Sequence, residues 1–223
     1  MFKQFREFNR QEKILVFGDP SAGMGDYCAC QFLSVQKRDI PLVYHDKRLA
    51  TEMTNSIFPV LERIFDTTGV KPTIAYERNN GGVFEMERLA SLNRSGKFDI
   101  FRMPTFGSED NPDPVKLGWD TTSATRPKML SDLKEAIDKR LIMVYDVDTV
   151  NELFSFVLVQ ASSSWKAQAE TGAHDDLVMS LAGVWQLYQN TNLTPLSTNI
   201  PGPFASYMNK SRWERPKDPT LGI

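Results

Sequence analysis

Residues 172–179 read GAHDDLVM and place two adjacent carboxylates at the start of an apolar helix. Leu177, Leu181, Val184 and Tyr188 recur at helical spacing, so this helix must lie on a core. An aspartate is favoured at a helix start, where it can cap free backbone N–H groups. Capping needs only one aspartate, and two beside buried surface repel each other unless a cation or a proton intervenes. The stretch therefore indicates either a helix cap or part of a metal site.

The composition indicates an ordinary globular protein rather than a polycation. The chain has 223 residues, of which 41% are hydrophobic and 24% charged, with a net charge of −2. This length is enough for one large domain or two small ones. Because there is no bulk positive charge, any binding to nucleic acid must depend on local basic patches.

Several site and targeting classes are not supported by the sequence. Residues 21–26 (SAGMGD) are rich in glycine but lack the lysine of a P-loop, so ATP hydrolysis by that route is not expected. Cys28 and Cys30 offer half a zinc site at most, and we expect both to be small buried side chains. Residues 1–13 lack the apolar core of a signal peptide, and no apolar run nears the ~20 residues of a membrane span. The pattern is typical of a cytosolic protein.

The first half of the chain predicts a mixed α/β sheet. Residues 1–12 are expected to be a polar lead-in, helical in part. Three short strands joined by tight turns then predict an antiparallel meander. Alternating helices and strands follow, which is typical of a sheet with an antiparallel edge. The expected strands are residues 14–18, 26–35, 40–45, 73–76 and 99–103, and the expected helices are residues 49–66, with a kink or break at Pro59, and residues 83–94.

The second half predicts a long loop, more helix and a tail. Residues 104–126 are rich in proline and glycine, which is typical of a functional loop. Pro127 suits the start of a helix that we expect to reach residue 139. The proline-rich end indicates two regions, a folded domain over residues 1–190 and a tail over residues 191–223.

The acidic residues fall at the ends of expected elements. Asp19 ends the first apolar strand, Glu77 ends the strand of residues 73–76, and Asp175 and Asp176 open the apolar helix. Sites in open α/β sheets form at the carboxyl edge of adjacent strands. If these two strands are neighbours, Asp19 and Glu77 face each other. Hard divalent cations suit such a carboxylate set, and two ions about 4 Å apart would promote phosphodiester hydrolysis.

Three segments resemble the motifs of a known family, the nuclease domain of the large terminase subunit of tailed bacteriophages, in the ribonuclease H-like superfamily. They are residues 17–27 (FGDPSAGMGDY), 74–81 (IAYERNNG) and 172–180 (GAHDDLVMS). Residues 116–121 (KLGWDT) and 126–130 (RPKML) resemble the family's middle region. The similarity runs from about residue 13 to residue 190. It implies a ribonuclease H-like sheet flanked by helices, in agreement with the pattern above.

The resemblance also implies an activity and a site. The expected enzyme is a Mg²⁺- or Mn²⁺-dependent endonuclease, using two ions, that cuts concatemeric double-stranded viral DNA at genome packaging. Asp19 and Glu77 would bind metal, with Asp176 as the favoured third ligand and Asp175 in an outer or second-metal role. Asn79 would orient Glu77 or contact DNA. Further candidate DNA contacts are Arg78, Arg126 and Lys128.

Partners and alternatives follow from the same resemblance. Family members usually carry an ATPase motor, so this chain is expected to be an excised domain or one polypeptide of a split enzyme. Its partners would be the ATPase domain, the small terminase subunit and the portal or procapsid, in the host cytoplasm, with a monomer in isolation and no membrane. The alternatives are another ribonuclease H-like nuclease, such as a Holliday-junction resolvase, and a non-catalytic capsid- or motor-docking module.

Overall fold

A computed structural model describes residues 1–21, 27–103, 116–161, 164–169 and 175–191. The chain divides into two units, Met1–Thr191 and Asn192–Ile223. The second unit, and with it the tail expected from the sequence, lies outside the described residues, so the domain boundary stays a prediction. None of the helices described is long and apolar enough to cross a membrane.

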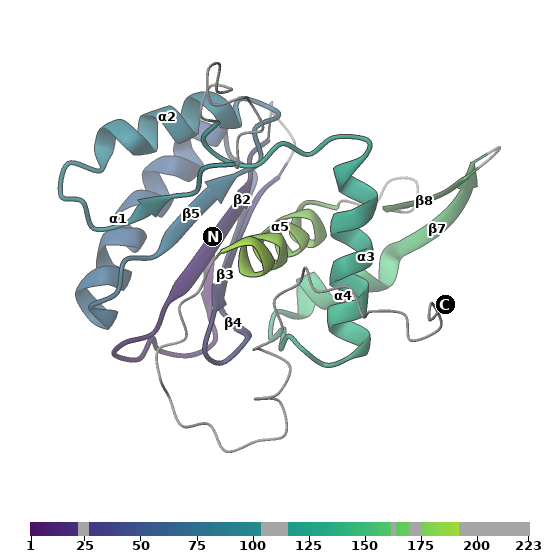
Figure 1. Cartoon of the computed structure of the whole chain (residues 1–223), viewed down its shortest axis with the longest axis horizontal. Helices are drawn as coiled ribbons and strands as arrows, with labels where there is room; N and C mark the ends of the chain where they lie inside the picture. Colours follow the sequence, from purple (N-terminus) through teal and green to yellow (C-terminus); the bar gives the residue numbers. More distant parts are fainter. Residues whose placement is uncertain (22–26, 104–115, 162–163, 170–174, 192–223) are drawn as a thin grey trace, which may run out of the picture. The chain divides into compact units, whose positions relative to one another are not determined.

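One six-stranded mixed sheet organises the first unit (Figure 1). Its strand order is β1-β4-β3-β2-β5-β6, with β1, β4, β3 and β2 antiparallel and with β5 and β6 parallel to β2. The α/β class and the meander expected from the sequence are confirmed. The strands are β1 Phe2–Gln4, β2 Ile14–Asp19, β3 Cys28–Ser34, β4 Asp39–Asp46, β5 Thr73–Tyr76 and β6 Asp99–Ile100.

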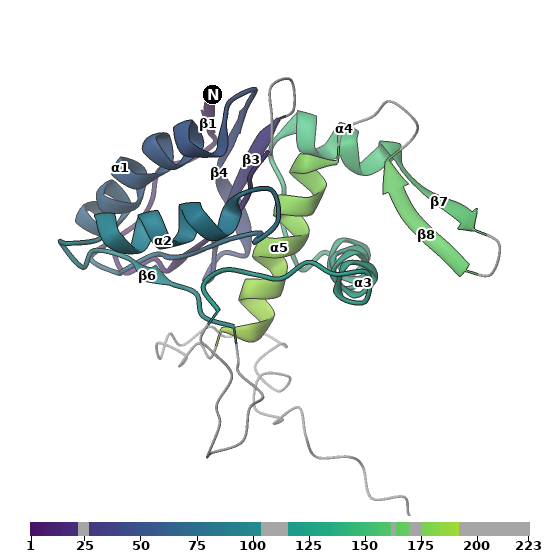
Figure 2. The same ribbon diagram turned by 90° about the horizontal axis from the view of Figure 1, so that it is seen from above.

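Helices cover both faces of this sheet (Figure 2). Helices α1 (Ala50–Thr68) and α2 (Gly82–Leu92) pack on one face, and α5 (Asp176–Asn190) packs on the other, with α3 (Thr125–Asp138) packed against α5. Helix α4 (Val147–Ser155) contacts α5. Strands β7 (Phe156–Ala161) and β8 (Ser164–Ala169) form a separate antiparallel pair.

Strand β2 divides its side chains between the two cores. Leu15 and Phe17 belong to the cluster that contains α3 and α5, whereas Ile14 and Val16 belong to the cluster with α1 and α2. All four are fully buried, because successive side chains of a strand point to opposite faces and both faces are covered. A continuous apolar run is therefore what this central position requires.

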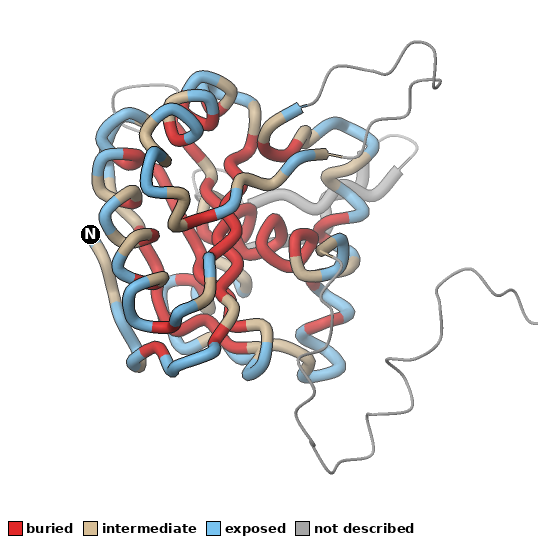
Figure 3. Tube along the Cα trace, turned by 60° about the vertical axis from the view of Figure 1, so that its left-hand side comes forward, coloured by how far each residue is buried: buried red, intermediate tan, exposed pale blue. Residues whose placement is uncertain are grey.

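Helix α5 is buried along most of its length (Figure 3), from Leu177 to Leu187. It approaches the sheet closely because Gly183 faces Phe17 of β2. A Cβ atom at Gly183 would lie 2.3 Å from the carbon atoms of the Phe17 ring, far inside van der Waals contact. The absence of a side chain at Gly183 thus sets the distance between α5 and the sheet.

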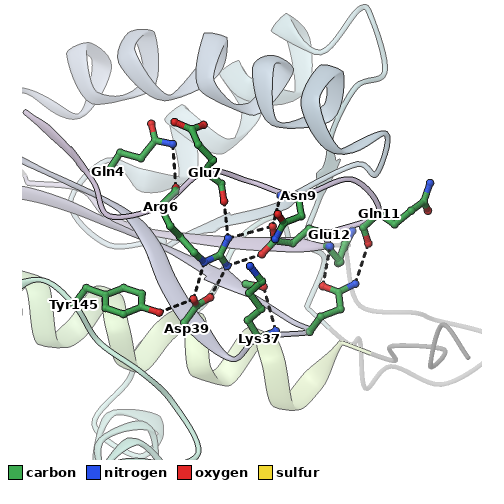
Figure 4. Close-up of polar contacts among 12 residues, drawn as sticks. Gln4, Arg6, Glu7, Asn9, Gln11, Glu12, Lys37, Asp39 and Tyr145 are labelled. Atoms are coloured by element: carbon green, nitrogen blue, oxygen red, sulfur yellow. Dashed lines mark hydrogen bonds and ion pairs between the residues drawn. The ribbon is translucent and has the colours of Figure 1, made fainter. Parts of the chain in front are cut away.

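An arginine network joins the N-terminal segment to the sheet (Figure 4). The guanidinium of Arg6 donates to Asp39 at 2.6 and 2.7 Å and to Glu12 at 2.5 Å, and the Tyr145 hydroxyl donates to Asp39 at 3.0 Å. Burial raises the pKa values of Asp39 and Glu12, but the hydrogen bonds from Arg6 outweigh it and both pKa values are lowered. The network stabilises the fold when both acids are ionised.

Local expectations differ from the structure at three places. The N-terminal lead-in is not helical where β1 forms, since Phe2 packs against the ring of Tyr44 at 4.9 Å between centroids. Of the kink or break expected at Pro59, the break is absent, because helix α1 continues through this exposed residue, and the kink stays a prediction. Helix α3 begins at Thr125, two residues before the proline that was expected to open it.

Gly183→Ala should destabilise the protein by about 1–3 kcal/mol, as overpacking does, despite the better helix propensity of alanine. The measurement is urea denaturation followed by circular dichroism. Phe17→Leu provides the matched control, because Gly183→Ala should cost much less in that background. Equal costs in both backgrounds would show that the Phe17 contact does not limit the approach of α5.

Candidate active site at the carboxyl edge of the sheet

Parallel pairing of β2 with β5 brings two of the expected acids together. Gly18 pairs with Tyr76, so Asp19 and Glu77 leave neighbouring strands at the same edge. The N–H group of Glu77 donates to the carbonyl oxygen of Gly18 at 2.9 Å, which extends the pairing by one residue. Glu77 is 8% exposed and Asp19 is partly buried. The adjacency expected from the strand ends is thus present in the structure.

A tight turn on one side and a β-bridge on the other hold the backbone around Glu77. A Cβ atom at Gly82 would lie 1.8 Å from the carbonyl oxygen of Glu77, so α2 can begin here only at a glycine. On the other side, Trp119 bridges to Glu77, and its N–H group donates to Tyr76 O at 2.9 Å. Trp119 is buried and packs against Phe101.

Asn79 holds the carboxylate of Glu77. Its amide nitrogen donates to Glu77 Oε1 at 2.7 Å and to the carbonyl oxygen of Thr121 at 3.1 Å. Of the two roles considered for Asn79, the orienting contact is therefore present. The contact with DNA stays a prediction.

The aspartate pair reaches the same edge from α5. Asp175 occupies the N-cap position and Asp176 the first helical position, but the Asp175 side chain makes no capping hydrogen bond. The cap comes instead from Glu152 of α4, whose Oε1 accepts from the N–H group of Val178 at 2.8 Å. Helix capping therefore does not account for the side chain of Asp175.

The four acids influence one another electrostatically. Burial raises the pKa of Asp19 well above its ordinary value, and the charges of Glu77, Asp176 and Asp175 raise it further, against the opposing charge of Arg126. Burial also raises the pKa of Glu77, although hydrogen bonds from Asn79 and Asp19 and the charge of Arg126 oppose it. Both carboxyl groups therefore resist ionisation more than they would in water.

Comparison with known proteins supports the fold. No protein-family model and no curated protein matches the sequence. Among solved structures, the large terminase nuclease domain of Thermus phage P74-26 aligns with a TM-score of 0.59 and 15% identity, over 86% of this chain and 87% of that one. The large terminase nuclease of thermophilic phage G20c with bound magnesium aligns with a TM-score of 0.61 and 16% identity, over 83% of this chain and 86% of that one. The fold is that of the large terminase nuclease domains.

A terminase nuclease domain from human cytomegalovirus has a similar fold. The manganese-soaked terminase nuclease domain of human cytomegalovirus aligns with a TM-score of 0.51 and 12% identity, over 78% of this chain and 82% of that one. The chain thus covers most of the length of these terminase nuclease domains. The ribonuclease H-like sheet expected from the sequence is confirmed.

The described basic residues near the site all have partners. Arg126 of α3 forms an ion pair with Asp175. Arg78 donates to Asp120 at 2.6 Å and to the carbonyl oxygen of Leu117 at 2.7 Å. These contacts hold residues 117–120 next to Glu77. Lys128 is exposed and pairs with Asp132 on its own helix. The contacts of Arg78, Arg126 and Lys128 with DNA stay predictions. His174, which precedes the aspartate pair, lies outside the described residues.

Two features of this site were not foreseen from the sequence. Glu152 lies in an unremarkable amphipathic helix, and nothing in its neighbourhood marks it as the cap of a helix that begins 24 residues later. The pairing of Arg126 with Asp175 joins positions 49 residues apart. Both contacts depend on how α3, α4 and α5 pack, which local sequence patterns do not specify.

Replacing Glu152 by glutamine should change how stability depends on pH. Burial is the largest cause that raises the pKa of Glu152, from 4.5 to about 8; Asp176 and Asp175 add to it, against the hydrogen bond from Val178. A raised pKa in the folded state stabilises the protein below the unfolded value, and this contribution is lost as pH rises through the folded value. Glutamine keeps the acceptor for Val178 but cannot titrate.

The melting temperature of wild type relative to Glu152→Gln should therefore fall between pH 4.5 and about 8 in metal-free buffer. Differential scanning calorimetry at a series of pH values measures it. Glu135→Gln, at an exposed position of α3, is the matched control and should parallel wild type. Parallel curves for wild type and Glu152→Gln would contradict the raised pKa.

Proposed function

We propose that the chain is a divalent-metal-dependent endonuclease that cleaves concatemeric double-stranded viral DNA during genome packaging. The observation that carries this proposal is the convergence of Asp19, Glu77 and the α5 aspartates at one edge of the sheet. The likeness to terminase nuclease folds supports it, and two of those structures contain magnesium or were soaked in manganese.

The donor set suits hard cations such as Mg²⁺ and Mn²⁺. The converging ligands are carboxylate oxygens, which these ions prefer, and their mutual repulsion favours any added positive charge. Within the described residues, no three His, Cys, Asp or Glu side chains are already gathered as a metal cage. Asp175 pairs with Arg126, so this ion pair must be exchanged when metal binds there.

The proposed ligands are Asp19, Glu77 and Asp176, with Asp175 in an outer or second-metal role. Two bound ions would supply an activated water and stabilise the charge that develops on the phosphate and the leaving oxygen. The chain's own residues prepare this chemistry. Asn79 orients the Glu77 carboxylate, and Glu152 fixes the first turn of α5 from which the aspartates project.

Recognition of DNA is proposed to depend on its phosphate backbone. Arg78, Asn79, Arg126 and Lys128 are the candidate contacts, all on or next to elements that carry the site. Cleavage of packaged genomes does not require base readout, and backbone contacts are independent of sequence. We further propose that the chain acts with the terminase ATPase, the small subunit and the portal or procapsid in the host cytoplasm, and that it is monomeric in isolation.

Asp19→Asn and Glu77→Gln should each reduce cleavage of plasmid DNA with Mn²⁺ by roughly a hundredfold or more, the loss expected when a charge-stabilising group is removed. Asp138→Asn is the matched control, since Asp138 is an exposed acid on α3 that pairs with Lys134. Circular dichroism checks that each variant is folded. Wild-type cleavage by a folded Asp19→Asn or Glu77→Gln variant would exclude these residues from the site.

A comparison of substrates separates the alternatives. A packaging nuclease should cut linear duplex and supercoiled plasmid DNA, whereas a junction resolvase should strongly prefer four-way junctions of the same sequence. Native and denaturing gels at equal DNA concentrations measure the preference. A folded wild-type protein that binds no Mn²⁺ but binds procapsids would instead support the docking module.

A further inference from the structure

Arg126 contacts one of the four acids and acts electrostatically on two others. Its Nη2 atom pairs with Asp175 Oδ2, and the two side chains are 36% and 34% exposed. Burial raises the pKa values of Asp19 and Glu77, which come from two strands of the sheet, and the positive charge of Arg126 opposes that rise. One guanidinium therefore offsets charge from three of the four acids. Such a group occupies the electrostatic position that a bound cation would otherwise take.

Hydrogen bonds at the start of α3 fix the backbone that carries Arg126. The N–H group of Arg126 donates to the carbonyl oxygen of Thr122 at 2.9 Å, and the backbone N–H groups and hydroxyls of Thr122 and Thr125 exchange hydrogen bonds. Thr125 also donates to the carbonyl oxygen of Asp120 at 3.1 Å. The same turn supplies Thr121 O, the second acceptor for Asn79. The segment that orients Glu77 thus also places Arg126.

We propose that Arg126 is an internal counter-ion that competes with the divalent metal for the carboxylates, so that metal binds only as the guanidinium leaves Asp175. This proposal rests on the proposed function, because it concerns the same site. The physical reason is charge: a guanidinium and a divalent cation repel each other, and a carboxylate oxygen paired with arginine is not available to a metal.

Competition of this kind has a consequence for the metal-free protein. Without a counter-ion the converging carboxylates would repel one another, and the ion pair with Arg126 relieves part of that repulsion while the site is empty of metal. The ion pair therefore stabilises the folded site and weakens its affinity for metal at the same time. A guanidinium that has left Asp175 is free for the phosphate contact proposed above.

The test is isothermal titration calorimetry of Mn²⁺ into the full chain without DNA. Arg126→Gln should bind Mn²⁺ about tenfold more tightly than wild type, equivalent to ~1.4 kcal/mol. Arg126→Lys keeps the charge and should stay within about threefold of wild type. Lys134→Gln removes the same charge from an exposed position of the same helix and should bind as wild type does.

The outcomes separate this proposal from the proposed function. If wild type binds Mn²⁺ and Arg126→Gln binds equally or less tightly, the counter-ion role is wrong while the metal site stands. If Arg126→Lys or Lys134→Gln also tightens binding about tenfold, the cause is not displacement of the Arg126 charge and the proposal is overturned. If wild type, folded by circular dichroism, binds no Mn²⁺ at all, the proposed metal-dependent function fails first.

Discussion

The contact between the Phe17 ring and Gly183 determines both the core and the site. Phe17 lies two residues before Asp19 on β2, and Gly183 lies two helical turns after Asp176 on α5. Because no side chain separates them, α5 sits close enough to the sheet to bury its residues from Leu177 to Leu187. The same close approach brings the first turn of α5 to the edge where β2 and β5 end. Packing and the arrangement of acids are thus consequences of one steric constraint.

That constraint has an electrostatic cost. Burial raises the pKa values of Asp19 and Glu77, and the neighbouring acids raise that of Asp19 further. In the folded protein these two acids therefore ionise less readily than they would in water. The structure offsets this cost with the hydrogen bond from Asn79 to Glu77 and with the charge of Arg126. The ion pairs around Arg6 have the opposite effect on the pKa values of their acids. Hydrogen bonds from Arg6 lower the pKa values of Asp39 and Glu12, so the folded protein is stabilised when these acids are ionised.

Much of the fold could be predicted from the sequence, because its signals are local. The apolar run of β2 indicated a strand buried on both faces, and the acids at the ends of β2 and β5 were expected to meet if those strands are neighbours. The parts that could not be predicted are contacts between distant segments. The ion pair of Arg126 with Asp175 and the cap from Glu152 depend on helix packing. Helix α1 also continues through Pro59, since a proline on an exposed face removes one hydrogen bond without disturbing the buried stripe.

Capping is the simplest explanation for an aspartate at a helix start, and the structure provides a direct way to evaluate it. The cap of α5 comes from Glu152, and Asp175 makes an ion pair instead of a capping hydrogen bond. The helix would therefore retain its cap if Asp175 were neutral, and the acidity of that position needs another cause. Under the proposed function that cause is a metal ion, because the carboxyl groups of Asp19 and Glu77, whose pKa values are raised, would gain from a nearby positive charge. Because Glu152 supplies the cap, the Asp175 carboxylate can pair with Arg126 instead, and this is the ion pair that we propose a metal displaces.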